Sequence, residues 1–337
     1  MKNVIFFTHA EKRPSGGAKY IYDISETINK TLNFSSEVIH IKKKRVSRLI
    51  DTINKRFNFE KKKYSGWMLE DIECVKNFKY QWFSNKIKIK NDFNFNKDKD
   101  FVILPEIFAH FAVDLLIKND VDYSIFVQNG YCLNSTNNEK LLNKAYKNAK
   151  FILSGSNDTS ECIKLRFSKL KLKILKIVYS INIGSINYKD KKNIITYTSR
   201  KLPQHCNLVT SFLKSNLPKN WYLKNLNDLG YNQYLSELKK SKIFLSFSNL
   251  EGLGLPPVEA ALAGNHVIGY TGEGGKEYWK KPLFIKINSG EIKNFVSTVI
   301  NIINSKKSFS RTNYMNLKNK FSEYNKLQSI KKILKII

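Results

Sequence analysis

Short apolar runs alternate with longer stretches of helical periodicity along the first half of the chain. The runs predict buried strands, and apolar residues three and four positions apart predict helices that cover them. Strands are expected at 3–8, 36–41, 101–105, 123–128, 151–156 and within 172–180, and helices at 18–30, 107–118 and 138–149. Such alternation is typical of a parallel sheet with helices on both faces.

The same pattern restarts after a polar stretch at 180–193, with strands predicted at 194–199, 221–224, 242–248, 266–270 and 283–287. The chain has 337 residues, more than one core usually accommodates. We therefore predict an α/β protein of two doubly wound, Rossmann-like domains, 1–182 and 183–308. A helical segment at 309–337 is long for the second domain alone and could cross back to the first.

Composition favours a folded protein of the reducing cytoplasm. Hydrophobic residues make up 42% of the chain and aromatic residues 13%, which is enough for packed cores. The cysteines lie far apart without CxxC spacing, which favours free thiols, at Cys74, Cys132, Cys162 and Cys206. The N-terminal apolar run is too short for a signal peptide, and no stretch is as long as a membrane span.

The formal net charge is +30, and it has two explanations. A polyanion partner such as nucleic acid, an anionic membrane or a phosphorylated substrate would account for it. An AT-rich coding sequence would also account for it, because Lys, Asn, Ile, Phe and Tyr are all abundant. Arginine, which makes bidentate phosphate contacts, is sparse. Both explanations stay open.

One segment, residues 41–63, combines this charge with apolar residues at helical spacing, which are Val46, Leu49, Ile50, Ile53 and Phe57. This pattern fits a basic amphipathic helix on anionic lipid headgroups, and it fits an ordinary surface helix equally well. It makes an anionic membrane surface a candidate partner, with the protein peripheral on the inner face of the membrane. Because the chain shows no recognised nucleic-acid-binding fold, we predict no nucleic-acid partner.

Two motifs attract attention by their position directly after predicted strands, where doubly wound sheets bind their ligands. Gly16 and Gly17 follow the first strand, and glycines there let the amides of a helix start approach an anion. An ordinary tight turn explains them equally well. Arg200 and Lys201 follow the first strand of the second half, where adjacent cations can neutralise a pyrophosphate.

A third such motif, SNLEGLGLPPVEAALAGN at 248–265, carries the most chemistry. Gly252 and Gly254 free the backbone so that its amides can face an anion or sugar hydroxyls. Glu259 can accept two hydrogen bonds from a vicinal diol such as a ribose, and Glu251 could hold another hydroxylated ring. A nucleotide diphosphate sugar has a diol at each end of an anion, and it would satisfy all of these groups.

The helix after these glycines has predicted ends. Pro257 suits the first helical position and Gly264 suits the end, which puts Glu259 in the first turn, where the helix dipole stabilises a carboxylate. After the next strand, Gly274 and Gly275 belong to TGEGGKEYW, a glycine-rich loop that is consistent with a lid or a donor loop beside the same site.

Two DxD sequences, at 98–100 and 120–122, precede predicted strands. They would therefore lie at the amino end of a parallel sheet, opposite the usual binding edge. We interpret both as Asp-rich turns and predict no metal site.

EGLGLPPVE resembles the Glu–seven residues–Glu signature of the family 4 group of retaining glycosyltransferases, which have the GT-B fold. The flanking SFSN and AALAGNHVIGYTGEGGKE agree with it, and TYTSRK and SGGA resemble the Arg/Lys segment and the N-terminal glycine loop of that group. The likeness is contiguous over 242–277, moderate around 196–201 and weak over most of the first half. It implies a GT-B architecture, in which two Rossmann-like domains face a central cleft.

The resemblance also implies residue roles. Glu259 would bind the ribose, Glu251 would contact the donor sugar, and Arg200 and Lys201 would stabilise the departing diphosphate, so the last three would be catalytic. Gly17 would approach that phosphate from the other domain. Transfer would proceed with retention, by front-face attack within an ion pair, and would need no cofactor besides the nucleotide diphosphate sugar. The donor would also contact the backbone of Gly252, Leu253, Gly254 and Leu255.

One departure from the family pattern concerns the first half. Many members carry a histidine after an N-domain strand, near the reacting carbon. Here Glu106 follows FVILP directly, and His110 comes four residues later. A helix over 107–118 would put both on one face. His9, at the end of the first strand, is a third candidate for a cleft residue.

The sequence thus predicts a metal-independent glycosyltransferase of the hexosyltransferase class, with a saccharide or lipid-linked acceptor, in the synthesis of a surface polysaccharide or glycolipid such as lipopolysaccharide. Two alternatives remain. A nucleotide-sugar epimerase of the same fold would isomerise the donor without an acceptor. A basic membrane- or nucleic-acid-binding protein would have no catalysis.

Overall fold

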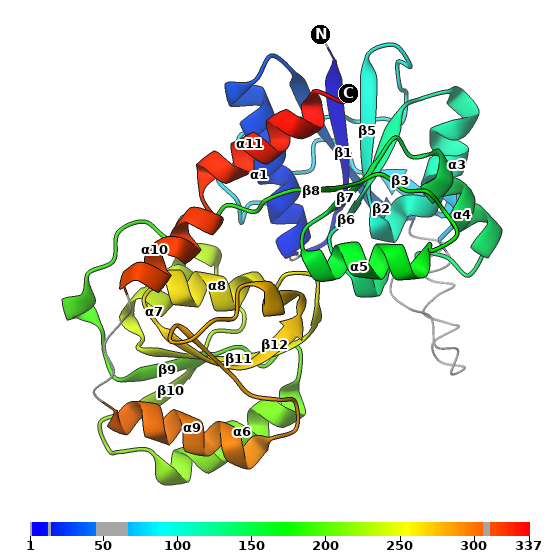
Figure 1. The fold of residues 1–337 in the computed structure, drawn as a ribbon. Coiled ribbons are helices and arrows are strands. Elements are labelled where there is room, and N and C mark those ends of the chain that lie inside the picture. Colours follow the sequence, from blue (N-terminus) through cyan, green and yellow to red (C-terminus); the bar gives the residue numbers. More distant parts are fainter. Residues whose placement is uncertain (1, 13–14, 45–66, 306–310) are drawn as a thin grey trace. The chain divides into compact units, whose positions relative to one another are not determined.

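The computed structural model describes residues 2–12, 15–44, 67–305 and 311–337, and the chain divides into two compact units (Figure 1). The first unit consists of Met1–Ile177 together with Leu327–Ile337, and the second of Val178–Lys326. The apolar stripe predicted within 41–63 begins at Val46 and lies outside the described residues.

The first unit is built on a mostly parallel sheet, whose strands pair in the order β3-β2-β1-β5-β6-β7-β8, with β4 also pairing β2. Strand β3 runs antiparallel to β2. Every residue of β5 and β6 is buried, as expected for apolar runs that helices cover on both faces. The strands are β1 (Asn3–His9), β2 (Ser35–Lys43), β3 (Ile72–Cys74), β4 (Lys88–Ile89), β5 (Asp100–Pro105), β6 (Tyr123–Val127), β7 (Ile152–Ser154) and β8 (Ile174–Lys176).

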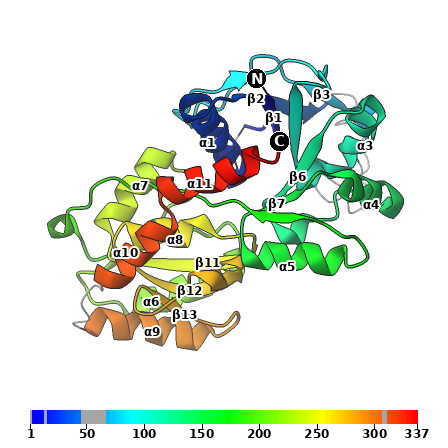
Figure 2. The same ribbon diagram turned by 45° about the horizontal axis from the view of Figure 1, so that its top comes forward.

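The positions of the helices in this unit are set by right-handed crossovers. The chain runs from β1 to β2 in one direction along the sheet, and from β5 through β6 and β7 to β8 in the other. Helix α1 therefore lies on one face of the sheet and α3, α4 and α5 on the other, while α11 lies beside α1 (Figures 1 and 2). The helices are α1 (Gly16–Thr31), α3 (Ala112–Leu115), α4 (Glu139–Asn148), α5 (Asn157–Arg166) and most of α11 (Glu323–Leu334), with 3₁₀ turns at η1 (Leu69–Asp71), η2 (Glu106–Phe111), η3 (Ile117–Asn119) and η4 (Gly130–Cys132).

The continuous helix expected at 107–118 is wrong, because the segment is broken into η2, α3 and η3. All residues from Phe108 to Ala112 are buried, so this stretch packs on more sides than the single stripe of an amphipathic helix.

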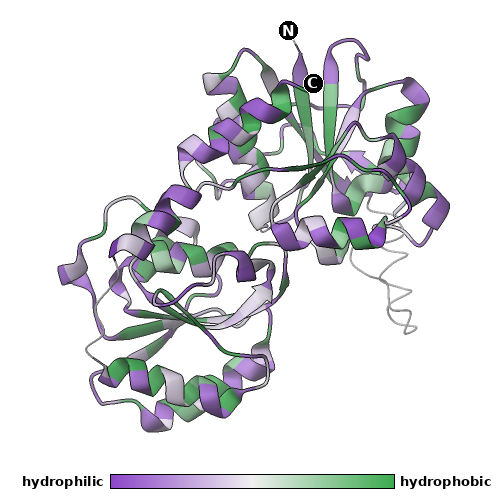
Figure 3. Ribbon diagram, viewed as in Figure 1, coloured by the Kyte–Doolittle hydropathy of each residue, from purple (hydrophilic) through white to green (hydrophobic). Residues whose placement is uncertain are grey.

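The second unit has a parallel sheet in the order β10-β9-β11-β12-β13. Helices α6 and α9 cover one face and α7 and α8 the other (Figures 1 and 2). Figure 3 shows the strands of both sheets as mainly apolar and the helices as mixed. The strands are β9 (Ile194–Tyr197), β10 (Tyr222–Asn225), β11 (Ile243–Glu251), β12 (His266–Glu273) and β13 (Phe284–Lys286). The helices are α6 (Pro203–Asn216), α7 (Tyr231–Lys240), α8 (Leu255–Leu262), α9 (Ile292–Asn304) and α10 (Arg311–Lys320), with 3₁₀ turns at η5 (Tyr188–Asp190) and η6 (Gly274–Glu277).

The polar stretch between the two repeats is anchored to the second unit by Lys191. Its ammonium donates to the carbonyls of Leu238, Ser241 and Ala263 at 3.2, 2.6 and 2.6 Å, near the ends of α7 and α8. Burial lowers the pKa of Lys191 to about 7, but the carbonyls at two helix C-termini favour the charged ammonium. We regard Lys191 as a structural cation.

The C-terminal segment expected at 309–337 forms two helices, α10 and α11, where the described residues resume at Arg311. Within α11, Ile330, Ile333 and Leu334 are buried. No helix in the described ranges is long and apolar enough to cross a membrane.

Candidate functional site

The topology of the second unit creates a switch point between β9 and β11. From β9 the chain moves to β10 on one side, and from β11 it moves to β12 and β13 on the other. The crevice outside the carboxyl ends of such neighbouring strands is where doubly wound sheets bind ligands. Arg200 and Lys201 follow β9, and Glu251 is the last residue of β11, so both predicted motifs lie at this point.

An ion pair joins the two motifs directly. Lys201 Nζ lies 3.2 Å from Glu251 Oε1, with the two side chains 34% and 24% exposed. Arg200 is exposed, and no carboxylate in the part of the chain that the structure describes lies within ion-pair distance of it. Asn227 holds the turn that carries these cations, because its Nδ2 donates to Ser199 Oγ at 2.6 Å and its Oδ1 accepts from the Ser199 amide. Two cations and one carboxylate therefore lie at this end of the sheet.

The glycine turn between Glu251 and α8 is braced from below by η6. The hydroxyl of the buried Tyr278 donates to the Gly254 carbonyl at 2.6 Å. A Cβ at Gly274 would lie 2.0 Å from the Gly252 oxygen, so the two backbones are in direct contact. Gly274 and Gly275 are both buried. Gly274 and Gly275 are therefore needed for close packing beneath the turn, which speaks against a lid and leaves the donor-loop role a prediction.

Backbone strain gathers at the same edge of the sheet. The non-glycine residues Leu250 and Glu273 have φ values of 41° and 67°, and Gly254 has a φ of 75°. The register between β11 and β12 shifts between Ser248 and Glu251. In the two non-glycine residues such a conformation costs about 1–3 kcal/mol each, and strain of this kind is found preferentially at ligand-binding sites; glycine adopts it without that cost. The regular pairing of β11 is therefore interrupted directly before Glu251, whose carboxylate meets Lys201.

Glu259 lies two residues deeper in its helix than predicted. Helix α8 begins at Leu255 rather than at Pro257, and its first turn contains no acidic residue, because Gly254 in the left-handed conformation starts the helix early. Gly264, with a φ of 81°, follows the helix end as predicted. Glu259 is only 6% exposed.

Two tyrosines from the start of α7 surround Glu259, and the sequence did not single them out. Tyr231 Oη donates to Glu259 Oε1 at 2.9 Å. The rings of Tyr231 and Tyr234 stack at 6.2 Å between centroids. Burial raises the pKa of Tyr234 well above its ordinary value, and the Glu259 carboxylate adds to this effect. The carboxylate is thus held by a hydroxyl donor, the kind of partner that a ribose diol would offer it.

In the first unit, Gly17 lies in the first turn of α1, which Ser15 caps through its hydroxyl. A Cβ at Gly17 would lie 1.9 Å from Gln128 Oε1, and Gln128 Nε2 donates to the Gly17 carbonyl at 3.3 Å. Gly17 therefore permits close contact between α1 and the end of β6. This packing alone explains why a glycine is needed here. The contact of Gly17 with a phosphate stays a prediction.

Glu106, a predicted cleft candidate, is buried beneath that contact. Its carboxylate accepts hydrogen bonds from the amides of Gln128 and Asn129 at 3.0 and 3.1 Å. Burial raises the pKa of Glu106 to about 7, against the opposing effect of the amides. At 4% exposure, Glu106 organises the turn after β6, which corrects its assignment to the cleft.

The two candidate histidines are also enclosed. His110 is 2% exposed, and its ring nitrogens lie 3.0 Å from Ser135 Oγ and 2.8 Å from the Trp67 carbonyl. Its assignment to the cleft is wrong, because both nitrogens serve to join segments of the core. His9 is 7% exposed, and its carbonyl accepts from Tyr80 Oη at 2.8 Å.

Both DxD sequences lie at the amino ends of β5 and β6, as predicted. Asp100 Oδ2 accepts from the Asn96 amide at 2.8 Å, which is an Asp/Asn turn. Within residues 2–12, 15–44, 67–305 and 311–337, no cluster of His, Cys, Asp and Glu could hold a metal ion.

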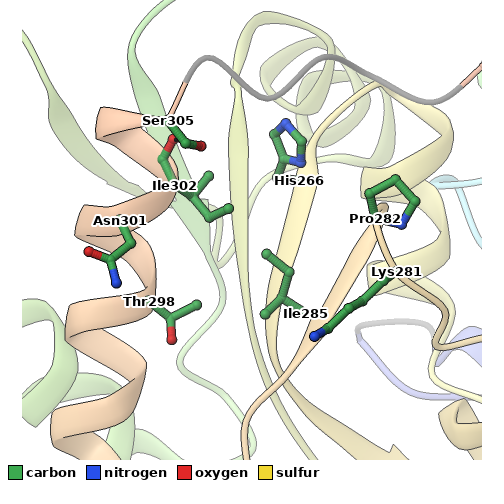
Figure 4. Close-up of a pocket in the computed structure, with 8 residues that line it drawn as sticks. All are labelled: His266, Lys281, Pro282, Ile285, Thr298, Asn301, Ile302 and Ser305. Carbon is green, nitrogen blue, oxygen red and sulfur yellow. Dashed lines mark hydrogen bonds between the residues drawn. The ribbon is translucent and has the colours of Figure 1, made fainter.

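A pocket of about 240 Å³ opens at the opposite edge of the second sheet (Figure 4). It is lined by His266, the first residue of β12, and by residues of the β13 region and α9 such as Lys281 and Ile302. It lies at the amino ends of the strands, so it is separate from the crevice that holds Lys201 and Glu251.

No model of a known protein family matches the chain, and no curated protein matches it by sequence. Solved structures of glycosyltransferases match it over its whole length, which confirms the predicted GT-B fold class. At identities this low, the likeness establishes the fold alone.

Three of these structures define the likeness. Sucrose-phosphate synthase from Thermosynechococcus elongatus superposes with a TM-score of 0.68 at 8% identity, over 99% of this chain and 98% of that one. TarM from S. aureus, bound to UDP, gives 0.65 at 12% identity over 100% and 99% of the two chains. HepE from Anabaena in complex with UDP gives 0.63 at 12% identity over 100% of both chains.

Proposed function

We propose that the protein is a glycosyltransferase that moves a sugar from a nucleotide diphosphate sugar to an acceptor. The observation that carries the proposal is the ion pair between Lys201 and Glu251 at the switch point of the second unit, beside the braced glycine turn. The solved structures of the same fold that were crystallised with UDP support it, since they include TarM and HepE.

The residue roles follow from the chemistry that each group can perform. The buried Glu259 would accept the hydroxyls of the ribose and displace Tyr231 from one oxygen. Arg200 and Lys201 would neutralise the diphosphate as it leaves, because fixed cations stabilise developing charge without reorganising. Glu251, held by Lys201, would contact the donor sugar. Backbone groups of Gly252, Leu253, Gly254 and Leu255 would complete the donor site.

The proposal includes retention by front-face attack. It also includes independence from a metal, because Arg200 and Lys201 would supply the positive charge that the leaving diphosphate needs. The resemblance to family 4 supports both. The contact of Gly17 with the donor phosphate rests on that resemblance and on its place in the first turn of α1.

The acceptor is proposed to be a saccharide or a lipid-linked saccharide, in the synthesis of a surface polysaccharide or glycolipid on the cytoplasmic side of a membrane. The TarM structure holds fondaparinux and alpha-GlcNAc-glycerol beside UDP, and the pneumococcal transferase GtfA was crystallised with UDP and GlcNAc. These ligands support a carbohydrate acceptor.

The experiment is incubation of the protein with radiolabelled UDP-, GDP- and ADP-sugars, with and without oligosaccharide and lipid extracts as acceptors. We expect label to appear in an acceptor fraction, and Arg200→Ala to reduce that transfer at least 100-fold, whereas Lys214→Ala on the exposed face of α6 should leave it unchanged. Isomerised donor without acceptor would instead identify the epimerase of the same fold. Intact transfer by Arg200→Ala and by Glu259→Ala would overturn the site.

A further inference from the structure

The end of the first sheet carries a strongly basic strip. From Cys162 to Lys189 the sequence contains no aspartate or glutamate. Four lysines of this stretch are exposed between the end of α5 and β8, and we call them the basic edge: Lys164, Lys169, Lys171 and Lys173. Strand β8 is the last strand in the sheet order and pairs with β7. The basic edge therefore lies at the rim of the unit (Figure 1).

Two other cations close to the basic edge are already engaged. Arg166 Nη2 donates to both carboxylate oxygens of Glu139, each at 2.7 Å. Lys176 Nζ donates to Asn157 Oδ1 at 2.8 Å. Glu161 precedes the strip on α5 and is exposed, but it lies beyond ion-pair distance of any lysine in the described ranges. None of the four lysines of the basic edge has an ion-pair partner among the described residues.

Apolar side chains are interleaved with the lysines in two different ways. Leu170, Leu172 and Ile174 pack against the core of the first unit, so they turn the alternating lysines outward. Leu165 does not pack inward: it is 82% exposed, on the last turn of α5 between Lys164 and Arg166. A leucine this exposed contributes little to folding, and its side chain can still be buried in another apolar environment.

We propose that the basic edge, with Leu165, is the surface by which the protein docks on an anionic lipid bilayer. Each lysine near an anionic leaflet contributes roughly 1 kcal/mol, and a protruding leucine adds insertion of its side chain at the headgroup boundary. Nucleic acid fits this surface less well for two reasons. A protruding leucine lies unfavourably against a phosphate backbone, and Arg166, the only arginine between Cys162 and Lys189, is paired with Glu139.

This surface is independent of residues 41–63, which carried the membrane prediction from the sequence. It is also independent of the donor site, since none of its residues belongs to the second unit. Lysines on an edge strand have a competing use, because they discourage pairing with the edge of another sheet. That use does not explain the basic edge, because all four of its lysines lie outside β8 (Ile174–Lys176), and it does not explain the exposed Leu165.

The test is co-sedimentation with vesicles of 70% phosphatidylcholine and 30% phosphatidylglycerol, with pure phosphatidylcholine vesicles as reference. The variant Lys169→Gln/Lys171→Gln/Lys173→Gln is compared with Lys214→Gln/Lys219→Gln/Lys293→Gln, which removes the same charge from exposed positions on the second unit. We expect the first triple variant to reduce the partition coefficient at least tenfold and the second to change it less than twofold.

Leu165→Ser should reduce binding a further few-fold at a salt concentration that screens the lysines. Equal losses in both triple variants would show that only net charge matters, and they would overturn the proposal. If the first triple variant bound lipid normally but self-associated, the lysines would serve to prevent pairing with another sheet edge, and the docking proposal would be overturned as well. Binding of a 30-base DNA that depends on the basic edge, without lipid binding, would replace the bilayer by nucleic acid. UDP binding by the same variants should be unchanged, so failure here leaves the glycosyltransferase proposal standing.

Discussion

The close contact beneath the glycine turn gives the sharpest test of the donor site. In Gly274→Ala, the new methyl carbon would lie 2.0 Å from the Gly252 oxygen, 2.5 Å from the Gly252 carbonyl carbon and 2.8 Å from the Glu251 oxygen. All three are backbone atoms, so no side-chain rotation relieves the clash. Ordinary contact begins at about 3.4 Å, and the turn must therefore move by more than an ångström.

Two effects follow from that displacement. Overpacking of this kind costs roughly 1–3 kcal/mol of unfolding free energy, and each kilocalorie lowers the melting temperature of a domain of this size by roughly 2–4 °C. The turn also carries the amides that would face the donor, and a misplacement of about 1 Å in such a site can cost roughly 100-fold in activity. We expect both a lower melting temperature and at least tenfold weaker UDP binding.

The assay is thermal unfolding by circular dichroism together with isothermal titration of UDP. Gly230→Ala is the matched control, because a Cβ there meets nothing within 4 Å and its φ of −61° suits alanine. Gly275→Ala should fall between the two, since its nearest neighbour is the Tyr278 hydroxyl at 3.1 Å. A Gly274→Ala protein that matches Gly230→Ala in both measurements would refute the account of the brace.

Three further predictions concern single groups. Tyr278→Phe removes the hydrogen bond to the Gly254 carbonyl and should cost roughly 0.5–1.5 kcal/mol of unfolding free energy in urea titrations; a larger loss of UDP affinity than of stability is expected, and no loss of either would contradict the brace. Tyr231→Phe leaves Glu259 without its hydroxyl donor, so UDP affinity should change by several-fold while the melting temperature moves little, and identical titrations would exclude Tyr231 from the site. Burial raises the pKa of Glu106 to about 7, so between about pH 4.5 and 7 the folded protein binds a proton that the unfolded chain releases. The free energy of unfolding should therefore fall as pH rises through that window, by about 3 kcal/mol at most. In Glu106→Gln this dependence should vanish, and equal slopes of unfolding free energy against pH in the two proteins would contradict the assignment.

Much of the fold could be predicted because its strands are continuous apolar runs. The run from Val4 to Phe7 and the whole of β5 and β6 are buried, and each was visible as a short apolar segment between polar ones. The segment after β5 was predicted less well. Its residues are apolar on every side, so periodicity could not separate one long helix from a series of short turns.

The donor site could be predicted in part for a similar reason. The rule that ligands bind at strand carboxyl ends brought Lys201 and Glu251 together from positions 50 residues apart, and the structure places them 3.2 Å from each other. Tyr231 and Tyr278 were missed because tyrosine is abundant in this chain. Tyr231 adjoins no motif, and Tyr278 lies within TGEGGKEYW, where only the glycines were interpreted. Their role depends on tertiary contacts that leave no local pattern.

The candidates in the first unit failed for a different reason. Glu106 and His110 lie at a strand end, as catalytic residues do, but both are buried and hydrogen-bonded. Sequence position shows which edge of the sheet a residue occupies, and it does not show whether the side chain turns toward solvent or into the core.

The central claim is that the second unit binds a nucleotide diphosphate sugar through Arg200, Lys201, Glu251 and Glu259. Isothermal titration of UDP, GDP and ADP into the wild-type protein, Arg200→Ala, Glu259→Ala and the control Gly230→Ala tests it most directly. We expect one nucleotide to bind the wild type and the control alike, and to bind either site variant at least tenfold more weakly. Absence of binding to the wild type, or binding that neither site variant weakens, would contradict it.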